Sequence, residues 1–303
     1  MSVRSIRATV TSFIWNYDRT RVRAPWRILV PLLPVIAIGF SIGPVFFDAV
    51  AVPVAMLLLQ FSIAVATLVF VAASTRYLDH NRVIWDYGLR INHRWVSDLL
   101  AGFVIGLAGA TVPFLLGIYA GWFEVVDVLD SGAVALWSGL LILVLANLCV
   151  GFSEELLFRG VLLSNSIEGL RDRFPTQWAI VGGLLVMSVV FGSLHIGPQP
   201  IEHPFYLLTW VGVGVLFGVL YLLSGDLALP IGIHASFNIV HSGVMVRTSL
   251  PGELSAIARV EPTIQSPIVE YGGGIEAGGV LIVGLLAILW LLYFRDVEIL
   301  HSI

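Results

Sequence analysis

The sequence predicts an all-α, polytopic membrane protein, and three observations lead to that prediction. Of the 303 residues, 58% are apolar and only 12% are charged, about half of the roughly 25% charge that soluble domains carry. The mean hydropathy of +0.94 excludes both a water-soluble globule and a disordered chain. The apolar residues also gather into runs of about 20, the length that a helix needs to cross a bilayer, where open strands are not viable.

Eight apolar runs are long enough to be transmembrane helices. They lie near residues 28–47, 50–72, 98–121, 133–157, 178–196, 205–223, 227–246 and 274–294. We therefore expect a cytosolic arginine-rich arm over 1–27, N-terminal transmembrane helices over 28–132, a helical core over 133–246, an external loop over 247–273, and a last helix with its tail over 274–303. Glycines four residues apart, Gly102 with Gly106 and Gly214 with Gly218, indicate close helix packing.

The arginines predict the orientation. All 16 basic residues are arginine, and the net charge is −4 without a long basic run, so we expect no nucleic-acid partner. With the amino terminus in the cytosol, 14 arginines fall on cytosolic segments and only Arg247 and Arg259 on outer ones. Both termini are therefore expected in the cytosol. The outer segment 247–273 is rich in proline and glycine, which is typical of a flexible loop.

Two adjacent carboxylates end the apolar run at 133–157. An ionisable side chain at the centre of a span costs roughly 2.5–3.5 kcal/mol and is a functional candidate by default. Glu155 and Arg159 lie four residues apart, the favourable spacing for a helical ion pair. Glu154 points about 100° away and has no cation nearby in the sequence, which suits a general base. The alternative is an interfacial Glu–Arg pair without a function.

Two further polar sites lie in the following apolar segments. His195 closes the run at 178–196, and taken alone it is equally typical of an interfacial histidine. His234 and Asn238 are four residues apart inside the run at 227–246, so both side chains point the same way from one helix. His241 is a possible third member of that face.

Several other intramembrane chemistries are excluded. The single cysteine, Cys149, excludes an intrachain disulfide framework and a Cys-rich zinc site. No His-Glu-x-x-His occurs, which excludes that class of zinc protease. The Gly-x-Gly-Asp of presenilin-type proteases fails at Leu223, and the Gly-x-Ser of rhomboid-type proteases at Ser153 is followed directly by two carboxylates.

The three sites occur in a fixed order, each in or beside its own apolar run: Glu-Glu-x-x-x-Arg, Phe-x-x-x-His and His-x-x-x-Asn. This pattern resembles the CPBP family of intramembrane proteases, which includes the type II CAAX prenyl endopeptidases and bacteriocin-processing or immunity-related proteins. The resemblance covers residues 133–245 and makes the helical core the catalytic part. It implies an endopeptidase for membrane-associated or lipidated proteins and peptides, with membrane lipids as its surroundings and the cell membrane of a prokaryote as its location.

The resemblance also implies roles for the site residues. Glu154 would activate a water molecule, and His195 would help to bind or polarise it. His234 and Asn238 would stabilise the tetrahedral oxyanion, while Glu155 and Arg159 would hold the helix and tune Glu154. Whether a metal takes part stays open: Glu154, His195 and His234 could ligate zinc with one position left for water, or the reaction could need no cofactor.

Two other functions compete with a hydrolase. One is a non-catalytic scaffold, regulator or immunity factor of the same fold, which would have no need for buried Glu, His and Asn side chains. The other is a transporter that uses the polar groups as an ion path, although the sequence shows no inverted repeat of the transporter type.

The spacing of the turns makes a geometric prediction. Glu154 and His195 are equidistant from a turn at 172–175 and lie roughly 30 Å from it, whereas His234 lies roughly 13 Å from the turn at 224–226. The three groups meet only if the first hairpin projects further into the cytosol. The segment 197–204 would then climb, extended, toward the outer face.

Overall fold

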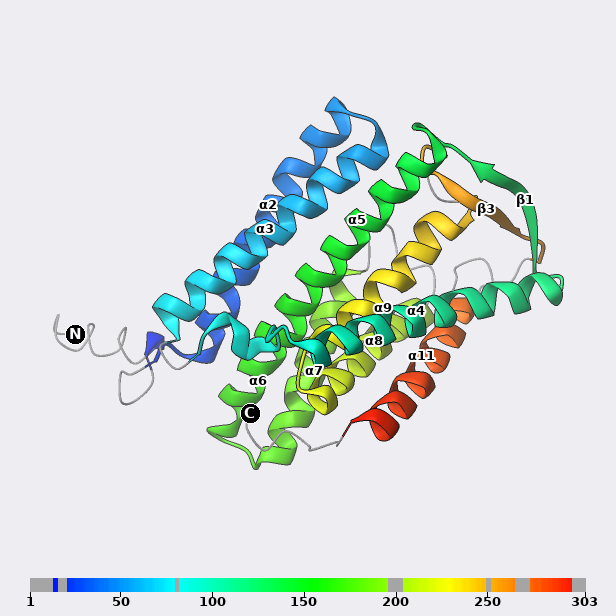
Figure 1. Ribbon diagram of the computed structural model, residues 1–303. Helices are drawn as coiled ribbons and strands as arrows, with labels where there is room; N and C mark the ends of the chain where they lie inside the picture. Colours follow the sequence, from blue (N-terminus) through cyan, green and yellow to red (C-terminus); the bar gives the residue numbers. More distant parts are fainter. Residues whose placement is uncertain are drawn as a thin grey trace.

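The computed structural model describes residues 13–15, 21–79, 82–195, 204–248, 252–264 and 273–295. It is a helical bundle with a small sheet at one end (Figure 1). Seven helices in the described part of the chain are long and apolar enough to cross a membrane, which confirms an all-α integral membrane protein. The helices are α2 (Ala24–Ala49), α3 (Val52–Leu78), η1 (Ile84–Tyr87), α4 (His93–Tyr119), α5 (Leu136–Glu155), η2 (Leu156–Leu163), α6 (Ser164–Arg171), α7 (Thr176–Leu194), α8 (Pro204–Ser224), α9 (Ala228–Ile239), η3 (Val240–Val244) and α11 (Gly273–Phe294).

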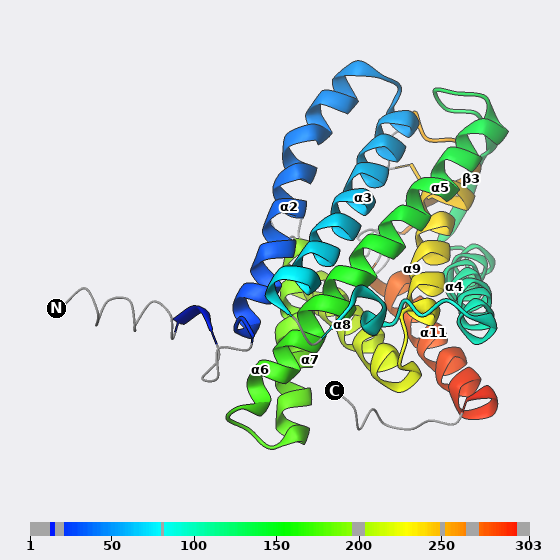
Figure 2. The same cartoon turned by 60° about the vertical axis from the view of Figure 1, so that its left-hand side comes forward.

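The fourth predicted span is much longer than the sequence indicated. α5, the π-helical η2 and α6 form one continuous helix of 36 residues, roughly 54 Å long, against a hydrocarbon core of about 30 Å. In both views of the ribbon the α6–α7 turn extends beyond the α8–α9 turn (Figures 1 and 2), in agreement with a projecting first hairpin. Of the expected climb over 197–204, only Pro204 is within the described residues, and it begins α8.

The span predicted over 227–246 is shorter than expected. Its helical part is α9 with its π-helical continuation η3, fewer than the about 20 residues that a full span needs. The close packing predicted from glycine spacing is confirmed. A side chain at Gly102 would collide with the Leu229 carbonyl, and one at Gly232 would collide with the Leu99 carbonyl, so α4 and α9 pack backbone to backbone.

A three-stranded sheet corrects the expectation of a flexible loop over 247–273. The strands β1 (Phe123–Asp130), β2 (Met245–Arg247) and β3 (Ala256–Pro262) lie in the order β1-β3-β2, with β1 antiparallel and β2 parallel to β3. Arg259 pairs with Asp130 and so joins the two predicted outer segments. The sheet lies at the opposite end of the bundle from the α6–α7 turn (Figure 1).

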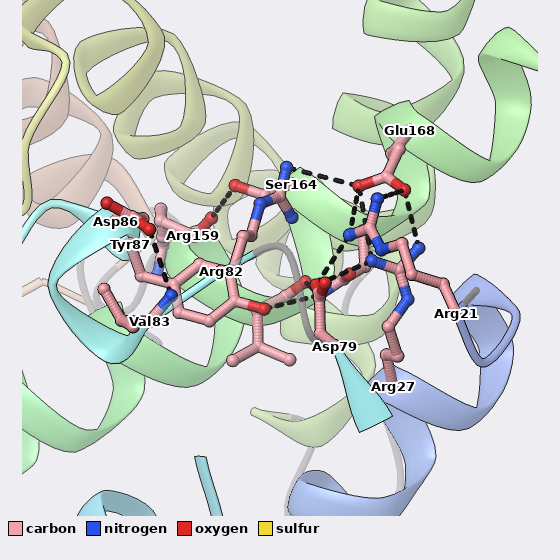
Figure 3. A network of polar contacts seen from close by, with 12 residues as sticks. Arg21, Arg27, Asp79, Arg82, Val83, Asp86, Tyr87, Arg159, Ser164 and Glu168 are labelled. Atoms are coloured by element: carbon pink, nitrogen blue, oxygen red, sulfur yellow. Dashed lines mark hydrogen bonds and ion pairs between the residues drawn. The ribbon is translucent and has the colours of Figure 1, made fainter. Parts of the chain in front are cut away.

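A network of ion pairs fastens that projecting end (Figure 3). Arg21 and Arg27 both reach Asp79 Oδ2, at 2.6 and 2.9 Å, and Arg27 also donates to Glu168 Oε1 at 2.8 Å. Arg82 approaches the same glutamate at 3.3 Å. Burial opposes ionisation of Asp79, yet the hydrogen bond from Arg21 and the charge of Arg27 hold the pKa of Asp79 below its ordinary value. The network thus ties the ends of α2 and α3 to α6.

The boundary of the predicted amino-terminal arm also moves. α2 begins at Ala24, not at residue 28, and Arg27 is a buried residue of that helix. Residues 1–12 and 16–20 of the arm lie outside the described residues. The largest apolar cluster surrounds η2, all eight residues of which are buried. The middle of the long helix therefore packs against protein on every side.

Candidate active site

The structure brings the three predicted motifs together from three helices. Glu154 lies in the last turn of α5, His195 caps the end of α7, and His234 lies in the middle of α9. Glu154 Oε2 is 3.7 Å from His195 Nε2 and 3.9 Å from His234 Nε2. The Glu154 side chain keeps 28% of its surface exposed, so the site is reachable although it lies within the bundle.

The neighbouring carboxylate faces the other side of His234. The predicted pair is confirmed: Arg159 Nη1 donates to Glu155 Oε1 at 3.0 Å, and both side chains are fully buried. The same oxygen lies 2.7 Å from His234 Nδ1, a contact that the sequence did not predict. One imidazole therefore stands between two adjacent glutamates.

Hydrogen-bond partners indicate where the histidine protons lie. His195 Nδ1 is 2.8 Å from the Phe191 carbonyl oxygen, and His234 Nδ1 faces the Glu155 carboxylate. Both partners accept only, so each neutral ring carries its proton on Nδ1 and a lone pair on Nε2. Three acceptor atoms, two Nε2 and one Glu154 oxygen, thus face one another at distances too long for direct hydrogen bonds. A shared water molecule is suited to such an arrangement.

Asn238 and His234 line a small cavity beside these groups. The cavity has a volume of about 40 Å³, room for water-sized groups, and Arg159 also borders it. Its remaining walls are largely apolar and include aromatic side chains from α7 and α8. The Trp210 ring stacks on His195 at 4.4 Å and 23°. Nothing in the sequence singled out Trp210, because its role depends on how α7 and α8 pack.

Other features of the site are structural. The Arg159 guanidinium lies over the rings of Phe191 and Phe217, at 4.4 and 5.1 Å from their centroids, where a desolvated cation is attracted to the ring faces. His241, the possible third member of the α9 face, stacks on Phe237 instead, and its Nδ1 lies 2.9 Å from the Phe237 carbonyl oxygen.

The donor set has the right atoms for zinc but not the right spacing. In a tetrahedral zinc site with bonds of about 2.0–2.2 Å, ligand atoms lie about 3.3–3.5 Å apart. The separations of 3.7 and 3.9 Å from Glu154 to the two histidines are wider. Within the described part of the chain, no group of three or more His, Cys, Asp or Glu side chains has a metal-holding geometry. The chemistry below is therefore derived from the side chains alone.

Fold and site together define a polytopic membrane protein with a carboxylate–imidazole centre built between its helices. The family model described as type II CAAX prenyl endopeptidase Rce1-like matches residues 136–240, the segment that carries Glu154, His195, His234 and Asn238. On those residues the chain is assigned to the CPBP/Rce1-like family, and the match supports a CAAX-type intramembrane protease kind of function. No curated protein and no solved structure matches the chain.

Proposed function

We propose that the protein is an intramembrane endopeptidase that hydrolyses peptide bonds of membrane-associated or lipidated proteins and peptides in the cell membrane of a prokaryote. The observation that supports it most is the convergence of Glu154 Oε2 with Nε2 of His195 and of His234. A scaffold or regulatory protein would gain nothing from this arrangement, because burying polar groups costs free energy.

In the first step, Glu154 takes a proton from a water molecule that His195 Nε2 helps to hold. The O–H bond breaks as the water oxygen forms a bond to the peptide carbonyl carbon. The carbonyl π electrons move onto its oxygen, which becomes the oxyanion of a tetrahedral intermediate. General-base assistance of this kind contributes typically about 10²–10⁴-fold to a rate.

His234 and Asn238 stabilise that oxyanion from α9. The Asn238 amide is a fixed neutral donor, and His234 donates from Nε2 when its ring is doubly protonated. Two carboxylates and one guanidinium leave one negative charge at the site, so a proton on His234 makes it neutral, and the Glu155 carboxylate on Nδ1 stabilises this imidazolium. One preorganised donor of this kind is worth about 3–4 kcal/mol. When the intermediate collapses, the C–N bond breaks and Glu154 returns its proton to the leaving amine.

An unbiased comparison of membranes tests the proposal. New peptide termini are mapped by mass spectrometry in membranes from cells that express the wild-type protein, Glu154→Gln or His195→Ala. We expect termini that depend on the wild-type protein to fall by at least about 100-fold in both variants. Glu124→Gln and His93→Ala change the same residue types at exposed positions and should leave the termini unchanged. Undiminished cleavage in both site variants would remove this site assignment.

Chelation separates the two versions of the mechanism. Because the donor spacing is wide for zinc, we expect cleavage by the purified protein to survive exhaustive treatment with a chelator. Loss of cleavage that returns when zinc is added back would instead show that Glu154, His195 and His234 hold a metal ion.

A further inference from the structure

α5 and α9 meet in one antiparallel register that extends beyond the site. Glu155 contacts His234, and eight residues back along α5 Asn147 contacts Ser242, which is eight residues further along α9 and η3. The Asn147 amide donates to Ser242 Oγ at 2.8 Å. Two polar contacts on one helix pair thus lie about 12 Å apart along the axes.

Asn238 lies halfway between these two contacts, level with Gly151 on α5. A side chain at Gly151 would come within 3.2 Å of the Ala235 backbone nitrogen and 3.1 Å of the Ile231 carbonyl oxygen. The lack of a side chain there lets the two helices approach closely. The depth of Asn238 relative to Glu154 is therefore set by how α5 and α9 are held at both ends of this short stretch.

A chain of hydrogen bonds leads from α5 to the backbone of Asn238. Asn147 donates to Ser242 Oγ and to the Leu143 carbonyl, both at 2.8 Å, and the Ser242 hydroxyl donates to the Asn238 carbonyl at 2.8 Å. This chain ends at Asn238, just before α9 passes into the π-helical η3. Asn147 is only 7% exposed, so its amide depends on these partners.

We propose that Asn147 and Ser242 are positioning residues that fix the Asn238 amide at the depth of the reacting carbonyl. The inference rests on the proposed function, in which Asn238 donates to the oxyanion. Such a donor acts only when it lies within hydrogen-bond distance of the place where the charge develops. Displacement along the helix axis lowers transition-state stabilisation, and therefore lowers kcat without weakening the binding of substrate.

Kinetics of a membrane-anchored peptide reporter test the proposal, with a cleavage site taken from the Glu154-dependent termini. Loss of a whole oxyanion donor costs about 10²–10³ in kcat, and misplacing one should cost less. We expect Asn147→Leu and Ser242→Ala to lower kcat by about tenfold or more with KM changed less than about twofold. Ser242→Thr keeps the hydroxyl and should restore kcat.

Asn165 offers a matched control. It lies in the same long helix and donates in the same pattern, to the carbonyl four residues back at 2.8 Å and to the Tyr87 hydroxyl at 3.1 Å. It is fully buried but not part of the site, so the folded fraction of Asn165→Leu should keep the wild-type kcat. An equal loss of kcat in Asn165→Leu would show a general packing effect and overturn the proposal.

A double-mutant cycle provides a readout that a merely structural role would not move. If Asn147 acts through Asn238, Asn147→Leu should not lower kcat further in an Asn238→Ala background. A full additional loss would overturn the proposal, as would wild-type kcat in Asn147→Leu and Ser242→Ala. If Asn147→Leu does not fold, Ser242→Ala alone decides. Should Glu154→Gln retain cleavage, the proposed function fails; should Glu154→Gln be inactive and Asn238→Ala slow while the Asn147 and Ser242 variants keep wild-type kcat, only this inference fails.

Discussion

Replacing Arg159 by methionine tests whether the buried ion pair holds the site together. Arg159 is fully buried, pairs with Glu155 at 3.0 Å and lies over two aromatic rings. Methionine keeps most of the volume and the apolar contacts but removes the charge. Glu155 would then retain only His234 as a partner for a carboxylate that no water reaches.

The expected loss is large because a charge is left behind rather than because a contact is lost. Removing one partner of a buried pair costs about 3–5 kcal/mol, and the attraction of the guanidinium to the rings belongs to the same charge and is not added. Since whole domains are stable by about 5–15 kcal/mol, Arg159→Met should lower the free energy of unfolding by a third or more. Glu155→Leu combined with Arg159→Met should recover part of that loss, because no charge remains buried.

Denaturant unfolding in detergent, followed by tryptophan fluorescence, measures this effect. Arg90→Met is the control, because Arg90 pairs with Asp86 at the same four-residue spacing but has a side chain that is 74% exposed; exposed pairs contribute about 0–1 kcal/mol. If Arg159→Met unfolds within 1 kcal/mol of the wild-type protein, the buried charge is compensated by something other than Arg159 and the reasoning is wrong.

Two further predictions concern the ends and the packing of α9. Burial raises the pKa of Asp226, in the α8–α9 turn, to about 6, against the opposing hydrogen bond from the Ala228 backbone. The resulting stability is present in full below the unfolded pKa of about 3.9 and is lost as the pH rises through about 6. Asp226→Asn cannot ionise, so its stability relative to the wild-type protein should increase between pH 4 and pH 8 by up to about 3 kcal/mol; a difference in melting temperature that does not change with pH would contradict this. Gly232→Ala should destabilise the protein by about 1–3 kcal/mol and slow cleavage, because its side chain would push α9 away from the Leu99 carbonyl. Gly212→Ala, in α8, meets nothing within 4 Å and should be neutral in the same melting and cleavage assays.

The sequence was sufficient for the parts of the site that depend on composition and local spacing. Apolar runs of about 20 residues predicted the spans, and the four-residue spacing of Glu155 and Arg159 predicted their ion pair. The contact between Glu155 and His234 was not predictable, because it depends on the register of two helices whose contacting residues are 79 positions apart. The stacking of Trp210 on His195 was missed for the same reason.

The sheet was missed because its strands are short and lie among loop-forming residues. β3 holds seven residues and β2 three, and prolines and glycines on both sides of β3 favoured a loop. Each strand gains its hydrogen bonds only from segments that lie far away in the sequence: Asp127 of β1 pairs with Arg259 of β3. Local patterns carry no information on such pairing, whereas a transmembrane helix satisfies its hydrogen bonds within its own segment.

The two π-helical segments explain how neighbouring residues acquire different roles. η2 begins directly after Glu155, and η3 begins two residues after Asn238. A π-helical turn holds an extra residue and rotates everything beyond it relative to a regular α-helix, which is why such turns are frequent at functional sites. η2 lets α5 present Glu154 and Glu155 to two sides of His234 while Arg159, within η2, reaches back to Glu155. Because the change of helix type falls immediately beyond the polar residues in both helices, α6 and β2 can follow directions that regular helices starting at Leu136 and Ala228 would not give them.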